Sequence, residues 1–369
     1  MKEAIKFLEN VIDIRQKKKV KHKMSDIIAI VFFAQLTRVE GWEEIEYFAR
    51  RCEDFLREHL ELPSGIPSHD TIERVFAIVS PEFLQKFRDR WNETVSAQET
   101  EKIRQLLSID GKTQRGNGNV NQSANHIVTA VNENGISIGE KLVKTKENEI
   151  KAIPELLDAL NIKNHIVTID AMGTQTDIAA KIRNKKADYV LALKGNQHSL
   201  FEDVKDYFAD LDFLKKCAYT RTVEKARSGI ETREYWQTDD IGWLPQRTKW
   251  RGLKTIGMTK NTIVKQGVKT EETRYFISSL GVDAKEFGRC VRGHWKVESF
   301  HWHLDVTFRE DADHTLEKQA AFNLNIIRKL ALSVLKLYDL KMKKGMSLKA
   351  KRYVIGLDPV RALKEIMAL

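Results

Sequence analysis

The chain has 369 residues, of which 42% are hydrophobic and 31% charged, a composition typical of a globular protein with a large core. Lysine and arginine outnumber acidic residues by 62 to 52, and the resulting net charge of +10 favours a polyanionic partner. The three scattered cysteines exclude a disulfide framework, and the absence of a signal-peptide pattern or long apolar run predicts a cytoplasmic protein without a membrane segment.

The first 100 residues show helical periodicity only. A basic run at 17–23 is followed by Ser25 and Asp26, which suit the cap of an apolar helix. Further helices are expected after Gly41 and over 71–79. A small helical module with a basic arm is as typical of a DNA-binding domain as of a scaffold, so composition leaves both interpretations open.

Strands become frequent after residue 105, and two of them end at an aspartate. One short apolar run ends at Asp110, and a later one ends at Asp170. The elements expected in chain order are strands at 106–109, 126–131 and 136–144, a helix at 147–160, a strand at 165–169, a helix at 174–184 and a strand at 187–193.

This order of elements is that of the ribonuclease H-like core. In that fold the first and fourth strands are neighbours, so Asp110 and Asp170 are expected to meet at one edge of the sheet. Two divalent metal ions about 4 Å apart need shared oxygen ligands to hold the attacking and leaving oxygens of phosphoryl transfer. Magnesium prefers carboxylates and keeps several waters, so two or three acids suffice.

A third acid, Glu298, lies on a helix expected over 292–311. The apolar stripe that would face the core consists of Val297, Phe300, Leu304 and Phe308. Glu298 lies well off this stripe. The side chains expected on its side of the helix are those of His294, His301, Trp302, Asp305 and Arg309.

A β-rich segment at 216–282 precedes this helix, with strands expected at 219–223, 230–237, 248–258 and 274–279. It contains Trp236, Trp243 and Trp250, which either fill a small core or stack on DNA bases. After the Glu298 helix we expect a long helix at 317–342 and a basic tail at 343–369. The residues expected to face inward on the long helix are Phe322, Ile326, Leu330 and Leu337.

Four ordered motifs, at 108–116, 168–175, 188–197 and 292–306, resemble the DDE transposases of the As-one insertion-sequence group, which includes the H-repeat-associated proteins of bacteria. The resemblance covers nearly the whole chain. It implies an α/β fold with a ribonuclease H-like catalytic core at 101–342 and a β-rich insertion at 216–282. An all-helical N-terminal domain at 1–100, expected to bind DNA ends, would precede the core.

The resemblance implies metal-dependent DNA cleavage and strand transfer at the terminal inverted repeats of an insertion sequence. Asp110, Asp170 and Glu298 would hold two Mg²⁺ ions, with Mn²⁺ able to substitute. The residues expected to contact DNA are Lys112, Arg115, Lys194, Arg292, Lys296 and Trp302. The expected partners are the inverted repeats, the target DNA and a second copy of the chain on the DNA ends, and the expected location is the nucleoid.

Other chemistries are disfavoured. A zinc site from His294, His301 and His303 is disfavoured because the last two fall on different helix faces. Neither G-x-S-x-G nor a phosphate-binding loop motif is present. The alternative that stays open is a catalytically inactive DNA-binding relative, since Ser299 stands where the group generally has asparagine. Intact acids at all three positions favour the enzyme.

Overall fold

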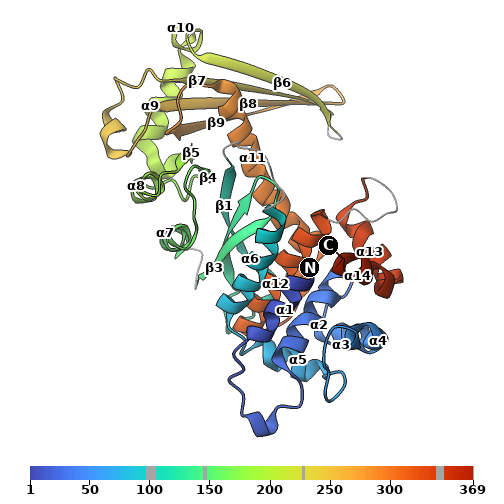
Figure 1. The fold of residues 1–369 in the computed structure, drawn as a ribbon. Helices are drawn as coiled ribbons and strands as arrows, with labels where there is room; N and C mark the ends of the chain where they lie inside the picture. The colour runs from blue at the N-terminus through green and yellow to red at the C-terminus, as the bar shows by residue number, and fades with distance from the viewer. Residues whose placement is uncertain (97–104, 144–147, 227–228, 338–344, 369) are drawn as a thin grey trace.

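The computed structural model describes residues 1–96, 105–143, 148–226, 229–337 and 345–368, and at its centre lies one mixed sheet (Figure 1). The strands follow in the order β3-β2-β1-β4-β5-β9-β8-β7-β6. They are β1 (Leu106–Thr113), β2 (His126–Asn132), β3 (Ser137–Val143), β4 (Ile166–Ile169), β5 (Asp188–Leu193), β6 (Ala218–Ala226), β7 (Gly229–Thr238), β8 (Thr255–Lys265) and β9 (Val268–Ser278). Together with the surrounding helices this is a mixed α/β architecture consistent with a ribonuclease H-like core.

The first five strands have the predicted topology. β2 is antiparallel to β1 and β3, while β1, β4 and β5 are parallel to one another. Ile109 on β1 pairs with Ile169 on β4. The first and fourth strands are therefore neighbours, as the sequence predicted.

The β-rich segment extends this sheet rather than forming a sheet of its own. β9 pairs antiparallel with β5, with Ile277 opposite Leu191, and β8, β7 and β6 follow outward. The strand predicted at 248–258 begins only at Thr255. Its first part contains a turn at Gly252, whose φ is +77°. Trp250, just before this turn, is buried in the core with 3% of its surface exposed.

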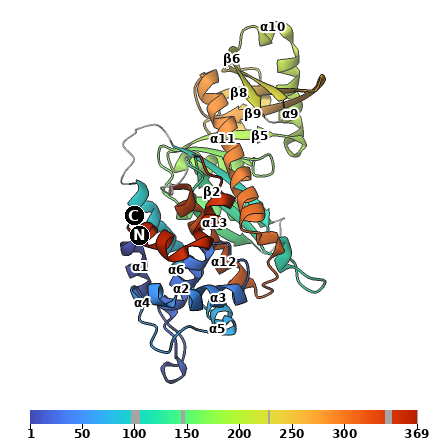
Figure 2. The same ribbon diagram turned by 90° about the vertical axis from the view of Figure 1, so that its right-hand side faces the viewer.

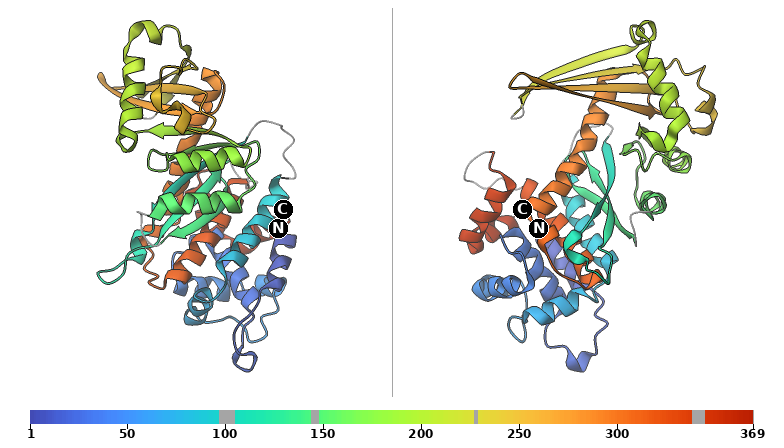
Figure 3. Two further views of the ribbon diagram at one scale, coloured as in Figure 1. Left: turned by 90° about the vertical axis from the view of Figure 1, so that its left-hand side faces the viewer. Right: turned by 180° about the vertical axis from the view of Figure 1, so that it is seen from behind.

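Helices cover both faces of the sheet. On one face lie α7 (Glu149–Ala159), α8 (Thr176–Asn184), α9 (His198–Ala209) and the short α10 (Leu211–Leu214). On the other face lies α11 (Ala284–Trp302), and Figure 3 shows the sheet between it and α7 and α8. The small core under α11 includes Leu106, Ile166, Val190, Phe276 and Phe287, so this helix is fixed directly on the central strands.

The first 96 residues form helices, and these share a core with the end of the chain. They are α1 (Lys2–Phe7), α2 (Met24–Leu36), α3 (Trp42–Arg51), α4 (Glu53–Arg57), α5 (His69–Phe76) and α6 (Pro81–Ser96). They pack around α12 (Lys318–Leu337), whose Phe322, Ile326 and Leu330 are buried as predicted. Leu337, also expected inside, is 43% exposed at the last described turn, and the remainder of the expected helix lies outside the described residues.

The C-terminal segment differs from the basic tail that we expected. It contains α13 (Leu348–Leu357) and α14 (Pro359–Met367), whose Ile355, Leu363 and Ile366 enter the core shared with the N-terminal helices. Arg352 is buried, and its guanidinium donates to the carbonyl oxygen of Thr37 at 2.7 Å. Lys351 and Arg352 thus donate to carbonyl groups inside the protein, whereas Lys349, Arg361 and Lys364 are exposed.

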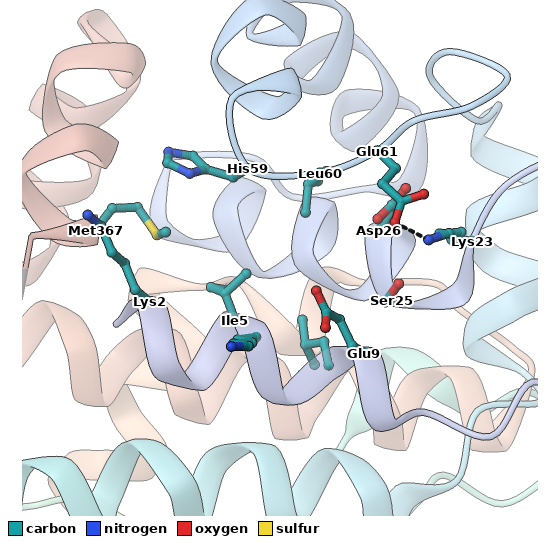
Figure 4. A pocket seen from close by; sticks show the side chains of 12 residues that line it. Lys2, Ile5, Glu9, Lys23, Ser25, Asp26, His59, Leu60, Glu61 and Met367 are labelled. Carbon is teal, nitrogen blue, oxygen red and sulfur yellow. Dashed lines mark ion pairs between the residues drawn. The ribbon is translucent and has the colours of Figure 1, made fainter.

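Two further features bear on function. Asp26, expected as a helix cap, is buried and accepts a hydrogen bond from the backbone N–H of Leu62 at 3.0 Å. It lines a pocket of about 180 Å³ between α1, α2 and the end of α14 (Figure 4), which contains none of the predicted catalytic acids.

No helix in the described part of the chain is long and apolar enough to span a membrane.

Candidate active site

Asp110 and Asp170 lie side by side where β4 ends, and β1, predicted to stop before Asp110, continues through it to Thr113. The parallel pairing of Ile109 with Ile169 brings the next residue of each strand together, although 60 residues separate them in sequence (170 − 110). Asp170 begins the loop after β4, and its Oδ1 accepts a hydrogen bond from the backbone N–H of Gly173 at 3.2 Å. Both aspartates are only partly exposed.

Polar contacts fix α11 against the same two strands. Ser108 Oγ donates to the carbonyl oxygen of Gly293 at 3.4 Å. Thr168 Oγ1 donates to Ser108 Oγ at 3.1 Å and lies 3.0 Å from His294 Nδ1. Ser108 and Thr168 each precede an aspartate by two residues, so they share its face of the sheet.

Glu298 follows His294 by one helical turn, so these contacts place it over the face of the sheet that bears the two aspartates. It lines a cleft of about 810 Å³ together with Asp170. The other charged and aromatic residues that line this cleft are Lys194, Glu272, Arg274, His294, Trp295, Phe201 and Phe276. Two of the three predicted acids thus open into one cleft, with the third on the neighbouring strand.

The three carboxylates influence one another. Burial raises the pKa of Asp170, and the nearby charge of Asp110 adds to the rise. Burial and the charge of Asp110 also raise the pKa of Glu298. Burial opposes ionisation of Asp110, but the contact with His301, whose Nδ1 lies 3.3 Å from Oδ2, acts together with His294 and the backbone N–H of Gly111 to lower the pKa of this aspartate.

This arrangement fits divalent cations. Carboxylates that raise one another's pKa are relieved by a shared positive charge, and three carboxylates are a donor set that magnesium accepts. Within the described residues, no group of three His, Cys, Asp or Glu side chains is gathered closely enough to hold a metal ion as it stands. The acids therefore fit the metal in the chemistry of their side chains and in the face of the sheet on which they lie, and their side chains would have to move closer together to hold it.

Comparison with known proteins gives the family. Residues 101–334 match the family described as "Transposase DDE domain", and residues 5–92 match the one described as "DDE_Tnp_1-associated". The chain belongs to the DDE transposase family.

Relatives support the same conclusion over nearly the whole chain. The "Putative transposase YncI" of Escherichia coli O157:H7 is 37% identical over 98% of this chain and 93% of its own length. The "H repeat-associated putative transposase YhhI" of Escherichia coli K12 is 35% identical over 91% of this chain and 90% of its own. The "Inactive transposase YbfQ" of the same strain is 41% identical over 20% of this chain and 89% of its own. The present chain is an insertion-sequence transposase.

The transposase does not present Lys112 to solvent as we expected. The ammonium group of Lys112 lies 2.7 Å from Asp305, 3.0 Å from Glu310 and 3.2 Å from Asp311. Its side chain is only 11% exposed, and the charges of these carboxylates outweigh its burial and raise its pKa. Because three carboxylates already surround it, we do not retain Lys112 as a phosphate contact.

The other residues expected to contact DNA are all exposed but differ in surroundings. Lys194 lines the cleft beside Asp170. Arg292 pairs with Glu224 of β6 at 3.1 Å, and Lys296 donates to the carbonyl oxygen of Glu133. Arg115 and Trp302 complete the set, and the indole of Trp302 is 55% exposed.

The helix that carries Glu298 begins and ends earlier than the predicted range of 292–311. It ends at Trp302 and continues as a π-helical turn over His303–Thr307. Arg309 then takes a φ of +53° and pairs with Glu40 at 2.9 Å instead of lying beside Glu298. The predicted apolar stripe holds, because its four residues are all fully buried.

The three histidines of the disfavoured zinc site have separate partners. His294 lies next to Thr168, His301 next to Asp110, and His303 Nδ1 lies 3.2 Å from Thr307 Oγ1. His301 is 8% exposed, so it supports the first aspartate from inside the protein.

Sequence reasoning missed Arg274. It lies on β9, lines the cleft with Glu298, and stacks its guanidinium 4.8 Å from the ring centre of Trp295. No local motif marks this arginine. Arg274 reaches the site only because β9 pairs with β5. These strands are far apart in the sequence, and no local pattern predicts that they pair.

Proposed function

We propose that this transposase cleaves the DNA strands at the terminal inverted repeats of its element and joins them to target DNA, with Asp110, Asp170 and Glu298 as metal ligands. The observation that carries this proposal is the placement of α11, through Gly293 and His294, over β1 and β4, next to the residues of these two strands that lead into Asp110 and Asp170. A purely structural role would not require Asp170 and Glu298 to line one cleft beside the strand that carries Asp110.

Each acid has a separate task. Asp110 would be the ligand shared by both ions, while Asp170 and Glu298 would each hold one. Bound Mg²⁺, or Mn²⁺ in its place, activates the attacking oxygen and stabilises the leaving oxygen of the phosphodiester. His301 keeps Asp110 oriented and ionised, and Lys194 and Arg274 lie in the cleft where they can bind phosphate oxygens.

Water and then the freed 3′-hydroxyl would act as nucleophiles, so no protein group becomes covalently attached to DNA. We further propose that residues 1–100 recognise the inverted repeats, that Arg115, Arg292, Lys296 and Trp302 contact DNA beside the cleft, and that two copies act together on paired ends within the nucleoid. The support is the match of residues 5–92 to a transposase-associated family and the net charge of +10.

The test is a cleavage assay on a duplex that carries the element's own end, with wild type and the isosteric variants Asp110→Asn, Asp170→Asn and Glu298→Gln. Each variant should lose cleavage in Mg²⁺ and in Mn²⁺ but keep its circular dichroism and its binding to the duplex. Asp177→Asn, at an exposed position of α8, is the matched control and should cleave like wild type. Unfolding of all three variants would favour a structural role for the acids.

The second candidate is a catalytically inactive DNA-binding relative. A relative that matches 20% of this chain is named "Inactive transposase YbfQ", which supports keeping this candidate. If wild type binds the end selectively but cleaves in neither metal, this candidate replaces the first.

A further inference from the structure

The segment between α1 and α2 forms a projecting arm. We define the basic arm as residues 11–23, which include a short helical turn at Lys17–Lys19. Figures 1 and 2 show it as the blue stretch that extends from the helical end of the molecule, away from the sheet. The strands β6–β9 lie at the opposite end, and β1, β4 and α11 lie between the two.

Hydrogen bonds fix the shape of the basic arm at its base. The guanidinium of Arg15 donates to Asp13 at 2.8 Å through Nε and to the carbonyl oxygen of His22 at 2.8 Å. His22 Nδ1 lies 3.2 Å from the carbonyl oxygen of Gly65, in the turn before α5. The two ends of the arm are thus hydrogen-bonded to each other and to a neighbouring loop, so the arm is held in one shape before it binds a partner.

The charges of the basic arm divide into paired and unpaired groups. Arg15 is neutralised by Asp13, and Lys23 by Glu61. The exposed lysines without an ion pair to any residue that the structure describes are Lys17, Lys18, Lys19 and Lys21. Four like charges held together at the tip repel a second copy of the same arm and attract a polyanion.

Two large apolar side chains accompany these lysines. Ile12 is 83% exposed and Ile14 is 72% exposed, although both sit in a segment whose backbone is fixed. Apolar side chains next to cationic ones suit the minor groove of duplex DNA, where proteins insert such residues against base edges and between base steps.

We infer that the basic arm binds the duplex part of the DNA end at a distance from the scissile bond, with its lysines on phosphates and its isoleucines in the minor groove. This inference rests on the proposed function. Because the arm and the catalytic cleft lie in different parts of the molecule, one DNA end would contact both only when its duplex is long enough to reach from one to the other.

The experiment uses the full chain and measures the affinity for an end-containing duplex at several salt concentrations. The variant Lys17→Ala, Lys18→Ala, Lys19→Ala should bind more weakly, with the slope of log K against log salt reduced by up to about 2.7 for three phosphate contacts. Lys151→Ala, Lys163→Ala, Lys349→Ala removes three exposed lysines outside residues 1–100 and should leave the slope unchanged.

A set of duplexes shortened from the side away from the cleavage point gives the second readout. The difference between wild type and the arm variant should disappear on the shortest duplexes, and the variant should cleave these at the wild-type rate. Ile12→Ser, Ile14→Ser should weaken binding to long duplexes with little change in the salt slope, because it removes apolar contacts only.

Several outcomes overturn the inference. One is an equal salt slope of the DNA affinity for wild type and the lysine variant. Another is a loss of affinity in the lysine variant that is as large on short duplexes as on long ones. If the isoleucine variant alters sedimentation but not DNA binding, the arm contacts a second copy instead. Failure of wild type to bind any duplex would count against the proposed function itself, whereas normal wild-type binding with an unaffected variant would count against the arm alone.

Discussion

Gly293 of α11 lies directly against Leu106 of β1: a methyl group added at Gly293 would lie 2.0 Å from Leu106 Cδ2. Because Gly293 has no side chain, the helix approaches the strand closely. This close approach positions Glu298, which follows Gly293 by five residues on the same helix. We predict that Gly293→Ala lowers the free energy of unfolding by about 1–3 kcal/mol, as overpacking does, and reduces cleavage more than end binding. Gly281→Ala, where no atom lies within 4 Å, is the control for both measurements.

Lys112 should behave as a structural residue. Replacing it by methionine leaves Asp305, Glu310 and Asp311 without their common partner, and breaking a buried ion pair costs about 3–5 kcal/mol. We therefore predict a large fall in the melting temperature of Lys112→Met. Lys194→Met, in the exposed position beside Asp170, should keep its melting temperature and lose cleavage. A stable Lys112→Met that binds DNA with a smaller salt slope would restore the original assignment.

Much of the site followed from local patterns, but this lysine did not. The apolar runs that lead into Asp110 and Asp170 and the apolar stripe beside Glu298 are visible in short windows of sequence, although β1 continues past Asp110 to Thr113. The partners of Lys112 lie in the segment after α11, and its surroundings depend on where that segment returns to β1. Arg274 depends in the same way on the pairing of β9 with β5. Contacts between distant segments have no periodic signal in the chain.

The C-terminal segment gives a second example. Lysines and arginines at 343–369 indicated a solvated tail, yet Arg352 is buried and bonds carbonyl oxygens. Charge alone could not separate these two environments. The apolar spacing of Leu363, Ile366 and Met367, all buried in α14, was the available signal for a packed helix.

The pH dependence of stability should include a contribution from His303. Burial lowers the pKa of His303 to about 4, so between pH 4 and its ordinary value of about 6.5 the unfolded chain binds a proton that the folded chain does not. Stability is therefore lost as the pH falls through this range, by less than the roughly 3.5 kcal/mol that about 1.4 kcal/mol per pKa unit would give, because solvent screens this partly exposed side chain. Thermal melts of His303→Gln should show a weaker pH dependence than wild type, and exposed His314→Gln should show none of this change.

The tryptophans of the β-rich segment should separate into two kinds. Trp250 is 3% exposed, so Trp250→Ala should destabilise the fold by about 3–5 kcal/mol. Trp243 is 41% exposed and stacks on Tyr207 with ring centres 5.2 Å apart. We predict that Trp243→Ala nearly keeps its melting temperature and its nicking rate but joins ends poorly, because an exposed indole can hold an unstacked base. Wild-type joining by this variant would assign Trp243 to packing.

The most direct test of the metal-bound triad replaces a carboxylate by a softer ligand. Asp170→Cys puts a thiolate at the cleft beside Glu298, and thiolates bind Mg²⁺ poorly but accept softer divalent ions. The measurement is the cleavage rate of an end-containing duplex by wild type and Asp170→Cys in Mg²⁺ and in Mn²⁺. We predict wild-type cleavage in both metals, and loss of the variant's cleavage in Mg²⁺ with partial recovery in Mn²⁺. Cleavage by Asp170→Cys in Mg²⁺ at the wild-type rate would contradict the assignment of Asp170 as a metal ligand.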